Sequence, residues 1–294
     1  MPQDDQRALL RAMPAVFVLV WSTGFVVARY GMPHAPPLGF LSWRYALSVL
    51  AFGVWIVLAR VALPRTRSQW GHLAVTGVLM HAGYLGGVWA AVKLGASAGT
   101  VALIVGLQPV LTAVWLASTS THRVAPRQWL GLALGLAGLL LVVWRKLGLG
   151  EIAAANVALS IAALLSMTVG TLYQKRYLTP GDVRAAMFVQ LLAALVVTLP
   201  LALWLESEPI RLHPELIGAM AWSVLVLTLG GSSLLFMLIQ RGAAAKVTSL
   251  LYLVPPCTAV MAWMLFGEAL GLAVLAGLAL TAIGVALVVR DGGA

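Results

Sequence analysis

The sequence predicts an all-α integral membrane protein with ten transmembrane helices, arranged as two inverted five-helix repeats around a central cavity. Three observations support this fold class: an apolar composition, ten separable apolar runs and an internal repeat. Of the 294 residues, 61% are hydrophobic and only 10% are charged, and the mean hydropathy is +0.97. Because a soluble domain carries about 25% charged residues, this composition excludes a water-soluble enzyme, a disordered chain and a secreted disulfide scaffold.

Each apolar run is long enough for one membrane crossing, which takes roughly 20 residues. Short segments with turn-forming or charged residues separate the runs. Backbone that is exposed to lipid has to satisfy its own hydrogen bonds, so these runs are expected to be helices. The ten predicted helices cover residues 12–30, 38–60, 70–92, 97–118, 127–145, 151–174, 183–205, 214–239, 244–266 and 270–289.

Basic residues in the predicted loops indicate the orientation. With the N-terminus in the cytoplasm, thirteen loop Lys and Arg residues lie on the cytoplasmic side and five lie outside. Because positive residues gather in cytoplasmic loops, we expect both termini to be cytoplasmic. The polar leader at residues 1–11 lacks the basic start and the cleavage site of a signal peptide, so the first run is expected to be a retained helix.

The chain repeats itself with an offset of 146–147 residues. Residues 131–144 (GLALGLAGLLLVVW) match residues 277–290 (GLALTAIGVALVVR). Upstream, residues 93–109 (KLGASAGTVALIVGLQP) match residues 240–256 (QRGAAAKVTSLLYLVPP). Glycine, proline and loop positions align in both blocks, which favours a true repeat over a chance match between apolar segments.

This repeat divides the chain into two predicted five-helix repeats, residues 1–147 and residues 148–294. Each half has an odd number of spans, so the second half must enter the membrane from the opposite side. Such an inverted repeat is the plan of many secondary transporters.

Proline interrupts two predicted helices at equivalent places. Gln108-Pro109 lies midway along the fourth predicted helix, and Pro255-Pro256 lies midway along the ninth. Proline removes a backbone donor and clashes with the preceding turn. Interrupted helices at matching places in two halves indicate a binding site near the membrane midplane. A plain packing kink is the alternative interpretation.

His81 and Tyr84 lie one turn apart near the centre of the third predicted helix. An ionisable residue at that depth usually faces a cavity or a partner, so both are candidate substrate contacts. The alternative for His81 is a satisfied structural histidine. Arg44, about two turns from the outer end of the second predicted helix, is a candidate gate or vestibule residue, unless its guanidinium extends to the outer headgroups.

Small and hydroxyl residues mark the first and sixth predicted helices, and Trp21 adds a large ring in the first. These residues either line a cavity or allow close helix packing. Glycines in the fifth and tenth predicted helices have the spacing of tight packing, so we interpret them as scaffold. Further candidates for inward-facing positions are Ser22, Thr23, Gly24, Ser166, Thr168, Gly170, Thr171, Gln190, Ser232, Ser233 and Gln240.

The sequence lacks the motifs that several functional classes of protein require. There is no phosphate-binding P-loop, no metal-ligand cluster, and no serine-histidine-acid set near a membrane surface. Cys257 is the one cysteine, so no internal disulfide forms. Because Glu151 and Glu268 lie at helix ends, no acid is expected inside the membrane, and His81 is the strongest candidate for proton coupling. We expect no enzyme activity, no metal, no cofactor and no nucleic-acid partner.

Four segments resemble the EamA-type members of the drug/metabolite transporter superfamily. They are WSTGF at 21–25, the pair Arg44-Tyr45, ASAGTVALIVGLQPVLTAV at 96–114 and KVTSLLYLVPPCTAVMAWMLFGEAL at 246–270. The likeness covers nearly the whole chain. Within the superfamily, the sequence looks most like the YddG-type amino-acid exporters, which include exporters of aromatic amino acids.

The resemblance implies a multi-pass exporter of the bacterial inner membrane, with both termini cytoplasmic. Its substrates would be amino acids, aromatic ones included, and similar small metabolites, moved by alternating access. It implies a central cavity lined largely by the first, third, fourth, sixth, eighth and ninth helices. Carried onto this chain, the substrate-binding residues would be Trp21, His81, Tyr84, Gln108 and Tyr252.

The sequence departs from the family pattern at one place. The family often has a Gly-Glu pair after both proline helices, and Gly267-Glu268 retains it, but Ser120-Thr121 stands in the first half. A paired role for those acids is therefore in doubt. Two alternatives stay open: an exporter of drugs or nucleobase-like metabolites, and a membrane-embedded enzyme on a lipid-linked substrate. The expected partners are a small-molecule substrate and the lipid bilayer, with the chain as a monomer or weak homodimer.

Overall fold

The computed structural model describes residues 3–119, 126–148, 153–178, 181–231, 234 and 253–289. Over these ranges the chain forms helices joined by turns, which agrees with the predicted all-α class. It divides into two compact units. Unit 1 comprises Met1–Val26, Ala98–Gly148 and Val226–Ala294, and unit 2 comprises Val27–Ser97 and Leu149–Leu225. Each unit therefore combines segments from both halves of the sequence.

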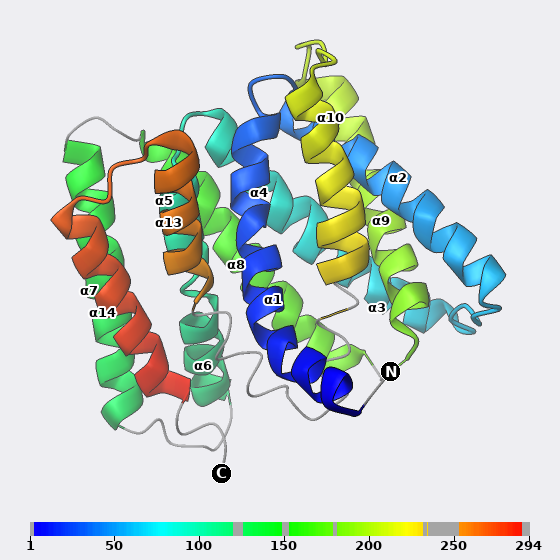
Figure 1. The fold of residues 1–294 in the computed structure, drawn as a ribbon. Coiled ribbons are helices and arrows are strands. Elements are labelled where there is room, and N and C mark those ends of the chain that lie inside the picture. Colours follow the sequence, from blue (N-terminus) through cyan, green and yellow to red (C-terminus); the bar gives the residue numbers. More distant parts are fainter. Residues whose placement is uncertain are drawn as a thin grey trace. The chain divides into compact units, whose positions relative to one another are not determined.

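Unit 2 contains most of the long apolar helices. Within it α2 packs along α9, α3 packs on α8 and α9, and α4 packs on α8 (Figure 1). The helices of this part of the chain are α2 (Pro37–Leu58), α3 (Arg67–Gly77), η1 (Val78–Gly83), α4 (Tyr84–Lys93), α8 (Ala154–Tyr177), α9 (Val183–Leu205), α10 (Pro214–Ala221) and η2 (Trp222–Gly231), of which η2 continues into unit 1.

Two helix pairs organise the described part of unit 1. In it α7 packs along α14, and α5 packs on α13 (Figure 1). The α1 helix starts in this unit and its last residues, from Val27, belong to unit 2. The helices are α1 (Gln3–Gly31), α5 (Ala98–Val105), α6 (Gln108–Thr119), α7 (Pro126–Gly148), α13 (Val254–Phe266) and α14 (Leu272–Val289).

Five helices in the described part of the chain are long and apolar enough to cross a membrane. They match the second, third, sixth, seventh and eighth predicted runs. Shorter apolar helices lie at the other five predicted places, so the count of ten spans stays a prediction. The five long helices are Pro37–Leu58, Arg67–Lys93, Ala154–Tyr177, Val183–Leu205 and Pro214–Gly231.

The fourth predicted helix, residues 97–118, is two helices in the structure. α5 ends at Val105, and α6 begins at Gln108. The amide of Leu107 bonds to the carbonyl oxygen of Ile104, three residues back, at 3.2 Å. Pro109 is thus the second residue of a new helix and not the midpoint of a kinked one, because the first turn needs no donor from proline.

Pro255 and Pro256 are likewise among the first residues of a helix, since α13 begins at Val254. Both prolines therefore occupy positions where their missing amide hydrogen costs no intrahelical bond. Residues 235–252 lie outside the described ranges. The two proline segments can therefore be compared only at the helix starts, Gln108 for α6 and Val254 for α13.

Glycines bring α7 and α14 into close contact. A Cβ on Gly138 would lie 2.6 Å from the carbonyl oxygen of Gly277, and one on Gly277 would lie 2.7 Å from that of Gly138. Gly284 similarly faces the backbone of Gly131 and Gly135. Such spacing lets membrane helices approach backbone to backbone. The interpretation of these glycines as scaffold is confirmed.

Two of the apolar helices contain a π-helical segment. One is η1, Val78–Gly83, between α3 and α4, and the other is η2, Trp222–Gly231, after α10. Adding the repeat offset of 147 to residues 78–83 gives 225–230, which lies inside η2. The third and eighth helices are thus irregular at equivalent places of the repeat. Single π turns occur often at functional sites.

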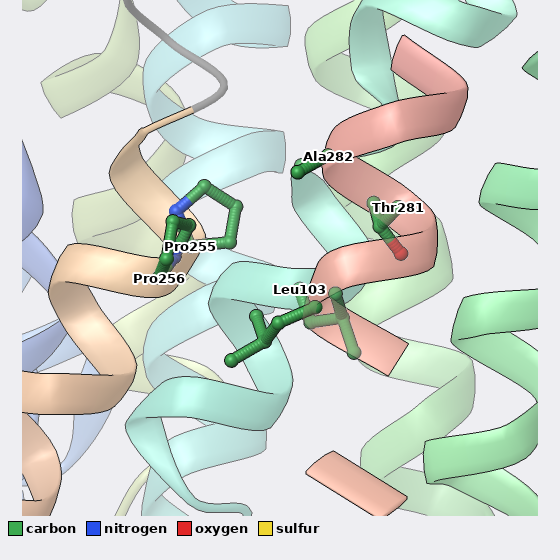
Figure 2. Close-up of a pocket in the computed structure, with 7 residues that line it drawn as sticks. Leu103, Pro255, Pro256, Thr281 and Ala282 are labelled. Atoms are coloured by element: carbon green, nitrogen blue, oxygen red, sulfur yellow. The ribbon is translucent and has the colours of Figure 1, made fainter. Parts of the chain in front are cut away.

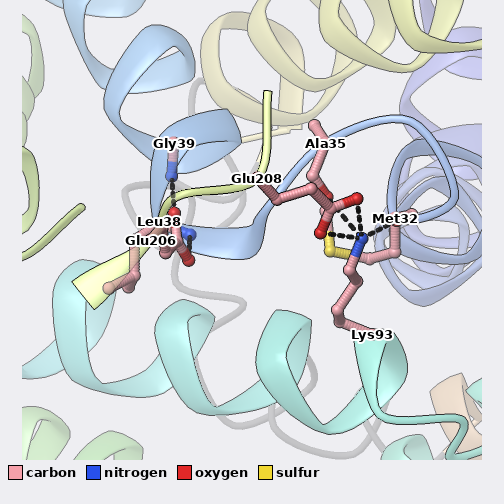
Figure 3. Close-up of polar contacts among 7 residues, drawn as sticks. All are labelled: Met32, Ala35, Leu38, Gly39, Lys93, Glu206 and Glu208. Atoms are coloured by element: carbon pink, nitrogen blue, oxygen red, sulfur yellow. Dashed lines mark hydrogen bonds and ion pairs between the residues drawn. The ribbon is translucent and has the colours of Figure 1, made fainter. Parts of the chain in front are cut away.

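Two glutamates tie together the connections at one end of unit 2. Glu206 accepts hydrogen bonds from the amides of Leu38 (2.8 Å) and Gly39 (2.7 Å), at the start of α2 (Figure 3). A carboxylate at this place offsets the partial positive charge of a helix N-terminus. Lys93, the last residue of α4, pairs with Glu208 at 2.7 Å and donates to the carbonyl oxygen of Met32 at 2.9 Å. The α1–α2 and α9–α10 connections are therefore held side by side.

Candidate functional site

Three of the predicted site residues meet in the interior of unit 2. Arg44 belongs to α2, His81 to η1, and Tyr84 begins α4. Arg44 is 7% exposed and Tyr84 is 8% exposed, and His81 is half-buried. The guanidinium of Arg44 is close enough to interact electrostatically with both His81 and Tyr84. A buried guanidinium among neutral polar rings is an arrangement that suits an anionic group.

The irregular backbone of η1 is held by hydroxyl groups from other helices. Tyr45 Oη, on α2, donates to the carbonyl oxygen of His81 at 2.9 Å. Ser166 Oγ, on α8, donates to the carbonyl oxygen of Leu79 at 2.8 Å. Carbonyl groups in an apolar interior need such donors. The side chains of Tyr45 and Ser166 therefore tie the backbone of η1 to α2 and α8.

The His81 ring has partners of its own. The side chain of Gln190 on α9 lies near it, and the Tyr45 ring lies edge-on to it with centroids 6.2 Å apart. Gln190 comes this close because Gly77 has no side chain: a Cβ there would clash with the Gln190 backbone. Glycine at position 77 thus allows the contact between α3 and α9 on which the position of His81 depends.

Trp21 and Gln108 belong to unit 1. Trp21 is half-buried on α1 and packs against Phe17, with ring centroids 5.2 Å apart. Gln108 is the first residue of α6, and its Nε2 lies 3.4 Å from Thr112 Oγ1. The structure therefore places these two residues in one unit and Arg44, His81 and Tyr84 in the other.

The first turn of α13 is hydrogen-bonded to α1 in unit 1. Thr258 Oγ1 donates to the carbonyl oxygen of Ser22 at 3.2 Å, and Ser22 Oγ lies 3.5 Å from the carbonyl oxygen of Val254. Ser22 also donates to the carbonyl oxygen of Val18 at 2.7 Å. This buried hydroxyl thus links two helices, which is the close-packing role that the sequence left open for it.

A small pocket lies beside the same proline turn, between α5, α13 and α14 (Figure 2). Its lining is apolar apart from the Thr281 hydroxyl, which is buried and has no hydrogen-bond partner. Gly106, which follows α5, and Pro255 approach each other closely here, since a Cβ on Gly106 would lie 2.6 Å from Pro255 Cγ. The lining residues are Leu103, Gly106, Pro255, Pro256, Leu278, Thr281 and Ala282.

The remaining predicted contacts cannot be placed in this way. Tyr252 lies outside the described residues, as do Ser232, Ser233 and Gln240. Tyr45 is a structural partner that the spacing of polar residues did not single out, because it lies beside Arg44 in an apolar helix. The role of Tyr45 can be recognised only in the structure, where its hydroxyl donates to the His81 carbonyl oxygen.

A family model of EamA-like transporters matches the chain twice, over residues 12–144 and 155–290. The chain belongs to the EamA-like transporter family. The two matches agree with the repeat seen in the sequence. This EamA-like protein is therefore a multi-pass membrane transporter, and family membership indicates a transporter rather than an enzyme.

Relatives of this EamA-like transporter carry transport names. A Salmonella typhimurium protein named "Probable amino-acid metabolite efflux pump" is 28% identical over 276 residues, covering 91% of this chain and 90% of that protein. The Escherichia coli K12 protein "Uncharacterized inner membrane transporter YedA" is 27% identical, covering 90% and 86%. A protein crystal structure with 18% identity matches with a TM-score of 0.67 over 94% of this chain and 95% of that chain, which supports the fold.

Proposed function

We propose that this EamA-like transporter exports amino acids, aromatic ones included, and similar small metabolites across the bacterial inner membrane. The buried group of Arg44, His81 and Tyr84 in unit 2 is the observation that carries this proposal. Polar and charged side chains are costly inside a membrane and mark substrate pathways. The name of the Salmonella relative, an amino-acid metabolite efflux pump, supports the substrate class.

In this proposal Arg44 receives the carboxylate of the substrate. A guanidinium can form two parallel hydrogen bonds to a carboxylate, and its burial excludes competing water. Tyr84 and His81 contact the rest of the substrate and select by shape. Trp21, Gln108 and Tyr252 stay predicted substrate contacts, and Pro109, Pro255 and Pro256 stay predicted helix breaks, on the resemblance and the matched prolines.

The transport cycle follows from the predicted inverted repeat. The ten spans form two five-helix repeats, residues 1–147 and 148–294, with both termini cytoplasmic, and they expose the site alternately to each side. Because no acid is expected inside the membrane away from the helix ends, export runs down the gradient that the cell makes. The protein acts as a monomer or weak homodimer, without a cofactor.

Transport by purified protein in liposomes tests the proposal. The twenty amino acids are screened with wild type, His81→Ala, Tyr84→Ala and Arg44→Lys, and His72→Ala serves as a histidine control outside the group. We expect uptake of amino acids by wild type and His72→Ala, and at least tenfold slower uptake by the three site variants. No uptake under any gradient would contradict the function, and normal uptake by all three variants would contradict the site.

The same liposomes distinguish the alternatives. If nucleobases or drug-like cations compete with amino acids in counterflow and exceed them as substrates, the substrate class is different. The membrane-enzyme alternative predicts chemical turnover of a lipid-linked substrate without net movement of solute. Neither outcome is expected from the arrangement of Arg44, His81 and Tyr84.

A further inference from the structure

Three side chains of metal-ligand type meet at one end of unit 2. His34 lies in the turn between α1 and α2, His213 precedes α10, and Glu215 is in the first turn of α10. The Nε2 atom of His34 lies 2.9 Å from Oε2 of Glu215, and Nδ1 of His213 lies 3.8 Å from the same oxygen. One ligand atom from each residue lies within 4.8 Å of the other two.

We propose that His34, His213 and Glu215 bind a divalent transition metal ion, with Zn²⁺ as the best fit. Two imidazoles and one carboxylate are a known ligand set for zinc, with a fourth position open to water. Zinc–ligand bonds of about 2.0–2.1 Å place tetrahedral ligand atoms about 3.3 Å apart. The two separations of 2.9 Å and 3.8 Å lie on either side of that value.

The same ligand set disfavours other common ions. Ca²⁺ and Mg²⁺ take oxygen ligands, and here a single carboxylate is offered beside two nitrogens. Imidazole suits zinc, copper and nickel. The bound ion would neutralise the carboxylate and leave one net positive charge, in a place where the side chains of His213 and Glu215 are each 49% exposed and water can complete the coordination.

One adjustment is needed for binding. The rings of His34 and His213 are stacked, with centroids 4.2 Å apart and planes 12° from parallel, so their lone pairs do not yet converge on one point. His213 Nδ1 also accepts a long 3.3 Å hydrogen bond from the Glu215 amide. Because His213 is half exposed, its ring can turn toward the ion, and water can replace it as the partner of the amide.

The segments that carry the ligands are already fixed to each other. The amide of Arg211 donates to the carbonyl oxygen of His34 at 2.8 Å. Glu206 and Glu208, earlier in the same α9–α10 connection, hold the start of α2 and the end of α4 (Figure 3). Only side-chain rotation is therefore needed, which lowers the entropic cost of forming the site.

Metal binding to the purified full chain, with any affinity tag removed, tests the proposal. Zinc affinity is measured by competition with a chelating dye, and Co²⁺ absorption reports the geometry around the ion. We expect one ion per chain and a visible absorption spectrum typical of four-coordinate Co²⁺. Binding should be weaker at acidic pH because the ligands must lose protons. His34→Ala, His213→Ala and Glu215→Gln should each weaken zinc binding roughly tenfold or more.

His72→Ala is the matched control, because His72 is also a half-buried histidine of unit 2 but hydrogen-bonds Tyr173 at 2.7 Å, away from the three ligands. It should bind zinc like wild type. Elution of each variant as wild type in size-exclusion chromatography shows that it is folded. The proposal is overturned if wild type binds zinc no more tightly than a variant that carries all three ligand substitutions. It is also overturned if His72→Ala loses as much zinc affinity as the single ligand variants. Both readouts are independent of transport.

Discussion

The carbonyl groups of His81 and Leu79 show how single residues make an irregular helix stable in an apolar setting. Each accepts a hydroxyl from a different helix, Tyr45 on α2 and Ser166 on α8. Both carbonyl oxygens also accept from the Tyr84 amide at the end of the π turn, so the two hydroxyls are additional donors that tie the irregular backbone to α2 and α8. His81 can then keep its ring for other partners.

Tyr45→Phe removes one of these donors and keeps the ring. We expect the free energy of unfolding to fall by about 0.5–1.5 kcal/mol, because the His81 carbonyl oxygen loses one of its donors and keeps the Tyr84 amide. Thermal and chemical unfolding in detergent measures the change. Tyr177→Phe is the control, since Tyr177 is 46% exposed and should keep wild-type stability. Equal stability of Tyr45→Phe and wild type would show that the hydroxyl is not needed.

Glycines decide the packing of whole elements in unit 1. Gly138→Ala places a methyl group 2.6 Å from the Gly277 carbonyl oxygen, closer than van der Waals contact allows. We expect α7 and α14 to separate slightly and the unfolding free energy to fall by about 1–3 kcal/mol. Unfolding in detergent is again the measurement.

Gly218→Ala on α10 is the comparison for this substitution. A Cβ at Gly218 meets nothing within 4 Å, and alanine in a helix is favoured over glycine by about 0.5–1 kcal/mol. This variant should therefore be as stable as wild type or more so. If both glycine variants behave alike, close backbone contact does not govern the α7–α14 pair.

The start of α9 carries a pH-sensitive cap. Asp182 Oδ1 accepts from the Arg184 amide at 2.8 Å, and Oδ2 pairs with the Arg184 guanidinium at 2.6 Å. The side-chain hydrogen bond from Arg184 holds the pKa of the Asp182 carboxyl below its ordinary value of 3.8. A lowered folded-state pKa means that the carboxylate stabilises the fold above pH 3.8, and that this contribution is lost as the pH falls through the folded-state value.

Asp182→Asn should therefore be less stable than wild type at neutral pH, and the difference should disappear when the pH falls well below 3.8. Unfolding midpoints measured from pH 7 down to about pH 2 test this. The stabilisation is expected to be small, because the Asp182 and Arg184 side chains are about one-third exposed and solvent screens their interaction. A difference that stays constant with pH would contradict the assigned cause.

At the scale of the whole molecule, the structure of unit 2 shows that the α1–α2 and α9–α10 connections lie at the same end of this unit. The Arg211 amide bonds to the His34 carbonyl oxygen, so residues 206–213 lie beside the α1–α2 turn. Residues 61–66 follow the other end of α2. If the predicted orientation is right, the first pair of connections faces outward and residues 61–66 face the cytoplasm.

Cysteine labelling checks this orientation. In a Cys257→Ser background, Leu212→Cys should react with an impermeant thiol reagent in intact spheroplasts, because position 212 is 85% exposed. Leu63→Cys, at a position that is 40% exposed, should react only after the membrane is opened. The reverse pattern would place both termini outside the cytoplasm.

Much of the fold could be predicted because lipid leaves few choices for an apolar run. The run at 183–205 became a helix with the same bounds, and Gly138 and Gly277 were interpreted correctly as packing positions. The sequence placed an interruption at Gln108-Pro109, and in the structure α5 ends at Val105 and Pro109 lies in the first turn of α6, where proline is tolerated.

The candidate site was less predictable. His81 and Tyr84 stood out as polar residues in an apolar run, and Arg44 did as a charge, so spacing was enough to name them. Tyr45 was named only within the Arg44-Tyr45 pair of the family resemblance, and its contact with His81 could not be predicted because it depends on a π turn, which has no clear sequence signal. His34 and Glu215 are 181 residues apart, so only the pairing of two connections brings them together.

The π turn at Val78–Gly83 also changes how the third helix presents its faces. Each inserted residue rotates everything that follows by about 100° around the axis. Tolerance to substitution along residues 67–93 should therefore follow a helical periodicity before the π segment and again after it. The two periodic patterns should differ in phase, with the change near Met80. A saturation scan that measures the amount of each variant in the membrane would show this change of phase. A single periodicity through all of residues 67–93 would mean that the segment is a regular α-helix in the membrane.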